Sequence, residues 1–118
     1  MKLAVIGSGY VGLVAGACFS DTGNDVTMVD IDPSRVEMLD QGQLPIYEQG
    51  LGEIVRRNAV GGRLTFTSDI SSAVAGADVV ILAVGTPSSP DGRVDMQWMD
   101  AAAEQVARAI AKYTVIVT

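Results

Sequence analysis

The sequence predicts a doubly wound α/β domain with a mostly parallel sheet, and three observations lead to this fold class. Short apolar runs alternate with stretches of helical periodicity along the whole chain. The apolar residues are mostly Val, Ile, Leu and Ala, as in buried parallel strands covered by helices. The 118 residues suit one domain with a substantial core.

The expected elements alternate as parallel strands joined by right-handed helical crossovers require. We expect strands over 3–6, 26–29, 64–67, 79–84 and 114–118, and helices over 10–22, 33–40, 51–58, 69–75 and from Asp95 to Tyr113. Because the last strand begins only at Thr114, we interpret residues 1–118 as a truncated part of a larger protein.

Local signals justify the ends and faces of several elements. The first helix ends at Gly23–Asn24, and Asp32-Pro33 combines an N-cap acid with proline at the first helical position. Gly76 closes the fourth helix, and Asp95 is the expected cap of the last one. The 79–84 strand is apolar throughout, which favours burial on both faces. Two helices show an apolar face, made of Val11, Val14, Ala15, Cys18 and Phe19 in the first and of Met99, Ala102, Val106, Ile110 and Tyr113 in the last.

Composition excludes several classes of function. The net charge is −6, and no Lys/Arg cluster exceeds Arg56–Arg57, which argues against a nucleic-acid surface. With one cysteine and no histidine, an intrachain disulfide and a Cys/His zinc site are excluded. We interpret Cys18 as a core residue. Neither a signal peptide nor a run of about 18 apolar residues is present, so we expect a cytoplasmic protein without membrane contact.

The segment GSGYVG places Gly7, Gly9 and Gly12 between the first strand and the first helix. This G-x-G-x-x-G spacing in a strand–turn–helix context is typical of Rossmann-type dinucleotide-binding domains. The first glycine permits the tight turn, the second lets a pyrophosphate approach the backbone, and the third lets the helix pack on the strand. N–H groups from Gly9 to Val11 and the helix dipole would hold the phosphates.

Asp30 ends the next strand, 18 residues after Gly12, where a carboxylate accepts hydrogen bonds from the adenosine ribose. Its charge favours NAD over NADP, and the following residue is Ile31 rather than an arginine. Arg35, in the first turn of the next helix, points back toward the strand ends. There it either meets an adenosine ribose or phosphate, or is a solvated surface residue.

Two loops are unusual for such a domain. The loop 85–94 is longer than typical strand–helix connections and favours a functional role, although Pro90 to Gly92 also fit an ordinary turn. In it Thr86 is a candidate partner of a ribose or phosphate oxygen, and Val84 with Gly85 a candidate wall of the adenosine site. The segment LPIYEQGL, residues 44–51, either directs Tyr47 or Glu48 toward a substrate or packs the tyrosine over the sheet edge. No nucleophile–base pair, carboxylate dyad or metal cluster is evident.

With these segments in place, the chain resembles the N-terminal domain of the UDP-glucose/GDP-mannose dehydrogenase family. The matching segments are VIGSGYVGLVAGACF, VDIDPSRVEML, LPIYEQGL, GRLTFTSDI, ADVVILAVGTPSSPDGRVDM and YTVIVT. LPIYE favours the UDP-glucose branch. Gln49 departs from the proline that usually precedes this glycine in the family, which affects the rigidity of that loop.

The resemblance implies an NAD-binding domain over residues 1–118 of an enzyme of nucleotide-sugar metabolism and polysaccharide biosynthesis. That enzyme oxidises UDP-glucose to UDP-glucuronate with two NAD, and a homo-oligomer is expected. The catalytic cysteine and its helping Lys, Asn and Asp lie in later segments, so no catalytic residue is assigned here and isolated residues 1–118 are expected to bind NAD weakly or not at all. The implied cofactor-binding residues are Gly7, Ser8, Gly9, Tyr10, Val11, Gly12, Asp30, Arg35, Val84, Gly85 and Thr86. Two alternatives stay open: a GDP-mannose 6-dehydrogenase, and a regulatory module that senses NAD or ATP without catalysis.

Overall fold

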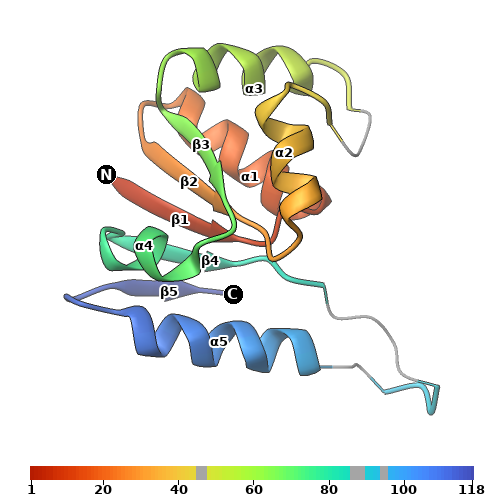
Figure 1. Cartoon of the computed structure of the whole chain (residues 1–118), viewed down its shortest axis with the longest axis vertical. Helices are drawn as coiled ribbons and strands as arrows, with labels where there is room; N and C mark the ends of the chain where they lie inside the picture. The colour runs from red at the N-terminus through yellow and green to blue at the C-terminus, as the bar shows by residue number, and fades with distance from the viewer. Residues whose placement is uncertain (45–47, 86–89, 94–95) are drawn as a thin grey trace.

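A computed structural model of the chain describes residues 1–44, 48–85, 90–93 and 96–118. Within these residues the strands are β1 (Lys2–Ile6), β2 (Asp25–Val29), β3 (Leu64–Thr67), β4 (Val79–Leu82) and β5 (Val115–Val117). The helices are α1 (Tyr10–Asp21), α2 (Pro33–Asp40), α3 (Leu51–Val60), α4 (Ile70–Ala75) and α5 (Gln97–Ala109). All strand pairs are parallel, in the order β3-β2-β1-β4-β5, so the predicted fold class is confirmed (Figure 1).

The core forms on both faces of this sheet, because successive side chains of a strand point to opposite sides. In β1, Leu3 and Val5 pack against α1, α2 and α3, whereas Ala4 and Ile6 pack against α4 and α5. Figure 1 shows the two groups of helices on either side of the strands. In β4, predicted to be apolar throughout, Val80 and Leu82 are buried and Val79 and Ile81 are half-buried.

The strand order reverses between β1 and β4. From β1 the chain builds outward through β2 to β3, and it then crosses back to place β4 on the other side of β1. In open α/β sheets such a switch point leaves a crevice at the carboxyl ends of the two strands, where ligands bind. Gly7 follows β1 and Ala83 follows β4, so the glycine-rich turn lies at this crevice.

Most predicted element boundaries are confirmed to within two residues. Asp32 caps α2 by accepting a hydrogen bond from the N–H of Ser34 at 3.0 Å, and Asp69 caps α4 in the same way. β4 ends at Leu82 rather than Val84, and α3 continues to Val60. Met96 occupies the N-cap position of α5, while the predicted cap Asp95 lies outside the described residues.

The predicted apolar face of α1 is only partly correct, since Val14 packs against the core but most of the predicted residues do not. The buried residues of this helix are Gly12, Leu13, Gly16, Ala17 and Ser20. Val11, Cys18 and Phe19 are exposed, so Cys18 is not a core residue. Small residues occupy the buried face because the helix lies close to the sheet: a methyl group on Gly16 would lie 2.2 Å from the sulfur of Met28 in β2.

The C-terminal part of the described chain is less buried than expected. Ala102 and Val106 of α5 are in the core, but the helix ends at Ala109, so Ile110 and Tyr113 fall beyond it and are exposed. The three residues of β5 are exposed as well. Among the described residues, no helix combines the length and apolar character needed to cross a membrane.

Candidate functional site

The turn after β1 is built by two glycines that the packing requires. Gly7 has φ of +105°, and a methyl group there would lie 2.7 Å from the carbonyl oxygen of Ala83. A methyl group on Gly12 would lie 2.0 Å from the carbonyl oxygen of Gly7. Larger residues at either position would force β1, β4 and α1 apart. The glycines therefore place the start of α1 directly at the switch point.

Gly9 differs from Gly7 and Gly12, because packing does not require a glycine at this position. Its φ is −72°, which any residue adopts, and a methyl group there would meet no atom within 4 Å. Gly9 occupies the N-cap of α1 without a side-chain cap, and no acidic residue lies in the first turn. The first N–H groups of a helix have no intrahelical acceptor and attract anions. This end of α1 is therefore open to a negatively charged group that approaches the backbone closely.

The carboxylate of Asp30 faces the glycine-rich turn. Its Oδ2 accepts hydrogen bonds from the N–H of Ser8 at 3.2 Å and from the Ser8 hydroxyl, and its Oδ1 accepts from the N–H of Asp32 at 3.0 Å. The Asp30 side chain is 12% exposed, and Arg35 lies beside it with Nη1 3.8 Å from Oδ2. The structure thus brings together the turn, the acid and the arginine, and Arg35 points back to the strand ends as predicted.

The segment after β4 borders the glycine-rich turn, with the backbone of Ala83 and Val84 next to Gly7. Val84 is half-buried against the core on the α4–α5 side, and Gly85 is exposed. The backbone N–H of Ala83 is bonded to the carbonyl of Ile6 at 2.8 Å, which holds this segment beside the glycine-rich turn. The candidate residue Thr86 lies outside the described residues.

A contact that the sequence analysis missed joins α1 to the loop before α3. The Tyr10 hydroxyl donates a hydrogen bond of 2.8 Å to Oε2 of Glu48, across 38 residues of sequence. This hydrogen bond raises the pKa of the Tyr10 phenol above its ordinary value. The presence of an acid in the unusual loop was visible in the sequence, but its partner was not, because only the packing of α3 beside α1 brings the two together.

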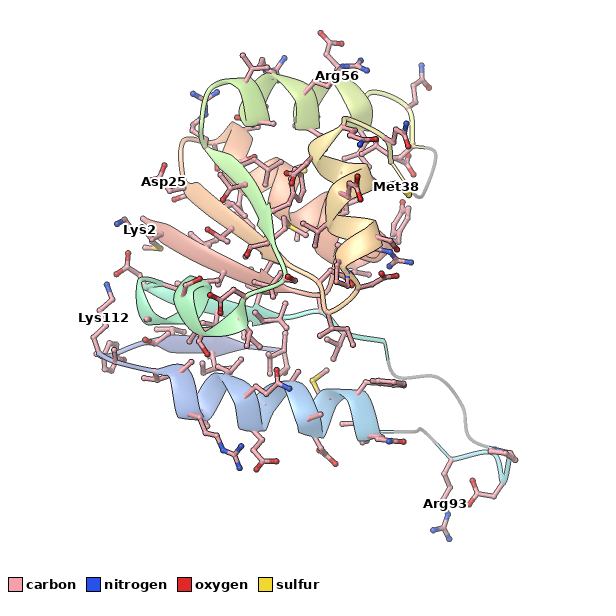
Figure 2. The ribbon with its side chains drawn as sticks, viewed as in Figure 1. Lys2, Asp25, Met38, Arg56, Arg93 and Lys112 are labelled. Atoms are coloured by element: carbon pink, nitrogen blue, oxygen red, sulfur yellow. The ribbon has the colours of Figure 1, made fainter. Side chains whose placement is uncertain are left out.

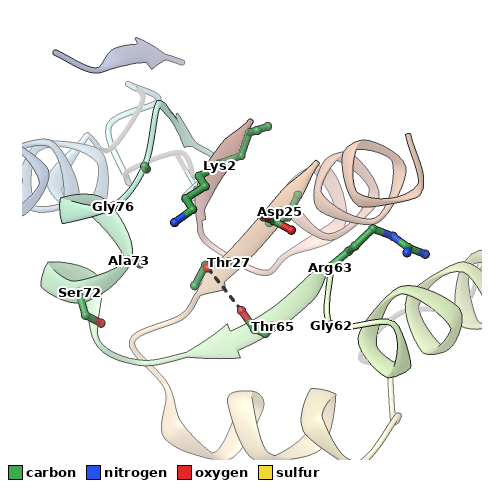
Figure 3. A pocket seen from close by; sticks show the side chains of 12 residues that line it. Lys2, Asp25, Thr27, Gly62, Arg63, Thr65, Ser72, Ala73 and Gly76 are labelled. Carbon is green, nitrogen blue, oxygen red and sulfur yellow. Dashed lines mark hydrogen bonds between the residues drawn. The ribbon is translucent and has the colours of Figure 1, made fainter. Parts of the chain in front are cut away.

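An open hollow of about 410 Å³ lies at the opposite edge of the sheet, among the amino ends of the strands. Lys2, Thr27 and Thr65 line it, and the two threonine hydroxyls are 3.4 Å apart (Figure 3). Figure 2 shows Lys2, Asp25 and Lys112 along this edge. Because ligands of such sheets bind at the carboxyl ends of the strands, the hollow is not the candidate site.

The described residues contain no group of three acidic or cysteine side chains arranged to hold a metal ion. A glycine-rich turn at a strand switch point, an exposed helix start and an acid at the end of the next strand together define a dinucleotide-binding α/β domain. Comparisons with known proteins identify the family to which this dinucleotide-binding domain belongs. The chain belongs to the UDP-glucose/GDP-mannose dehydrogenase family, whose NAD binding domain matches residues 1–118.

Individual relatives agree with this family. The chain is 50% identical over 119 residues to a UDP-glucose 6-dehydrogenase of Rhizobium meliloti (strain 1021), covering 100% of this chain and 27% of that protein. A UDP-glucose dehydrogenase structure from Pyrobaculum islandicum is 44% identical with a TM-score of 0.87. A ternary complex of GDP-mannose dehydrogenase from Pseudomonas aeruginosa is 34% identical with a TM-score of 0.89. Each structure covers 92% of this chain, which covers 25% of each.

The chain therefore spans about a quarter of the length of these relatives. Residues 1–118 match the NAD binding domain of the UDP-glucose/GDP-mannose dehydrogenase family, which confirms the family that the sequence resemblance implied. The match over residues 1–118 favours this interpretation over a regulatory module without catalysis.

Proposed function

We propose that this domain binds NAD for an enzyme that oxidises UDP-glucose to UDP-glucuronate. The observation that carries the proposal is that neither the backbone conformation nor the packing of the domain requires a glycine at position 9. A glycine in that position has a purpose when a pyrophosphate lies against the main chain. The residues present fit such a cofactor, since the helix start offers N–H donors and Asp30 offers acceptors beside it.

The proposed cofactor-binding residues form two groups. The pyrophosphate lies against the turn from Gly7 to Gly12, with Tyr10 and Val11 at its surface and the side chain of Ser8 buried beneath it. Asp30 holds the adenosine ribose and Arg35 lies beside it. Val84 and Gly85 flank the adenosine from the end of β4, and Thr86 bonds a ribose or phosphate oxygen. When bound, NAD supplies a hydride acceptor. Oxidation of a primary alcohol to a carboxylate removes four electrons, so two NAD are consumed per sugar nucleotide and water supplies the second oxygen.

UDP-glucose is the proposed substrate because of the identity levels. The chain is 50% identical to the Rhizobium enzyme named for UDP-glucose and 34% identical to the Pseudomonas enzyme named for GDP-mannose. GDP-mannose is the second candidate, supported by the TM-score of 0.89 to that structure. We further propose a cytoplasmic homo-oligomer for the full-length protein.

The test is an assay of the full-length protein with NAD and a panel of UDP- and GDP-sugars. We expect NADH to form with UDP-glucose, at two NADH for each UDP-glucose consumed. Activity with GDP-mannose alone would replace the substrate and leave the cofactor proposal intact. Absence of both NADH formation and NAD binding would contradict the proposed function.

A further inference from the structure

Ser8, the residue between the first two glycines of the motif, is buried with 1% of its surface exposed. A buried hydroxyl needs a hydrogen-bond partner, and carbonyl groups of its own helix often serve. Ser20, which is also buried, donates to the carbonyl of Ala17 at 2.8 Å in this way. Ser8 instead directs both its hydroxyl and its backbone N–H to one oxygen of Asp30, 22 residues away.

These bonds fix the orientation of the Asp30 carboxylate. Two donors from Ser8 hold Oδ2 toward the turn, and the N–H of Asp32 holds Oδ1 toward the start of α2. A carboxylate has about four acceptor positions, so part of its capacity remains for a ligand. Ser8 itself is too deeply buried for its hydroxyl to meet a ligand, and it acts through Asp30.

We propose that Ser8 is a positioning residue that sets the Asp30 carboxylate for a free ribose and so determines the preference for NAD over NADP. The inference rests on the proposed NAD binding. A 2′-phosphate carries a charge of about −1.5 to −2 and is repelled by a carboxylate held in place. A carboxylate that turns away leaves Arg35, 3.8 Å from it, to attract that phosphate.

The test measures the Kd of NAD and of NADP by calorimetry on the full-length protein and its variants. Ser8→Ala is expected to weaken NAD binding by up to roughly 10- to 150-fold, the effect of losing one hydrogen bond to a charged group. NADP binding should not weaken in parallel, so the ratio of the two Kd values narrows. Ser20→Ala is the matched control, because it removes an equally buried hydroxyl from the far end of α1, and it should leave the ratio unchanged.

A double-mutant cycle separates positioning from a structural effect. If Ser8 acts through the carboxylate, Ser8→Ala has no further effect on NAD binding in an Asp30→Ala background. An equal loss in that background, or equal weakening of NAD and NADP by Ser8→Ala, would overturn the inference while the proposed function stands. Failure of the unsubstituted protein to bind NAD would overturn both.

Discussion

At Gly12, an added methyl group would lie 2.0 Å from the carbonyl oxygen of Gly7, whereas at Gly9 it would meet no atom within 4 Å. Two glycines of one short motif are thus needed for different physical reasons. Gly12 lets α1 approach the end of β1, and its effect is on folding. Gly9 leaves space above the helix start, and its effect is on whatever occupies that space.

This difference makes a prediction for two substitutions that are chemically identical. Gly12→Ala should destabilise the fold by about 1–3 kcal/mol or more through overpacking. Gly9→Ala should leave the unfolding midpoint nearly unchanged but weaken NAD binding by roughly 5- to 150-fold, the equivalent of a similar clash with the ligand. Chemical denaturation measures the stability of both variants of the full-length protein, and calorimetry measures their affinity for NAD. Unchanged NAD affinity in Gly9→Ala would contradict the proposed position of the pyrophosphate.

On the scale of elements, α1 shows how periodicity alone misplaces a helix face. Both sides of this helix are apolar or small, with Val11 and Phe19 on one and Leu13 and Ala17 on the other. The side with the larger residues looks like the core face in the sequence. The structure buries the side with the smaller residues, because glycine and alanine allow the helix axis to come close to the strands.

Two truncations on α1 test this assignment. Leu13→Ala should lower the free energy of unfolding by about 2–5 kcal/mol, because it opens a cavity beneath a fully buried side chain. Val11→Ala, at a residue that is 70% exposed, should change it by no more than about 0.5 kcal/mol. Urea titrations of the two variants compare them directly. If Val11→Ala lowered the free energy of unfolding by more than this, the face of α1 that carries Val11 and Phe19 would be covered in the folded protein.

For the molecule as a whole, Asp78 joins chain segments that are far apart in the sequence. Its side chain accepts hydrogen bonds of 2.9 Å from the N–H of Lys2 in β1 and from Nζ of Lys112 before β5. These two hydrogen bonds hold the pKa of Asp78 below its usual 3.8, and the bond from Lys2 has the larger effect. Asp21, bonded to Arg57 and Asn58, also has a lowered pKa.

These lowered pKa values predict the direction of acid unfolding. A carboxylate with a folded-state pKa below its unfolded value stabilises the fold above the unfolded pKa, and this stability is lost as the pH falls through the folded one. The free energy of unfolding should therefore decline as the pH drops below about 3.8. Asp78→Asn should reduce this decline. Urea titrations between neutral pH and pH 2 measure it, and an unchanged pH dependence in the variant would contradict the role of Asp78.

The amino-acid sequence by itself determined the strand and helix order, the glycine-rich turn, the acid at the end of β2 and the family. These features depend on local chemistry: glycine at a tight turn, Asp32 or Asp69 at a helix start, and alternating runs of apolar residues. They can be read over a few neighbouring positions without knowledge of distant contacts.

Which face of α1 is buried, and that Cys18 is exposed, became clear only from the tertiary structure. The same is true of the hydrogen bonds between Ser8 and Asp30 and between Tyr10 and Glu48. Each of these depends on how closely α1 packs on the sheet and on which distant segments lie beside it. Periodicity gives the spacing of side chains along one helix, but burial and hydrogen-bond partners are set by the surfaces that meet it in space.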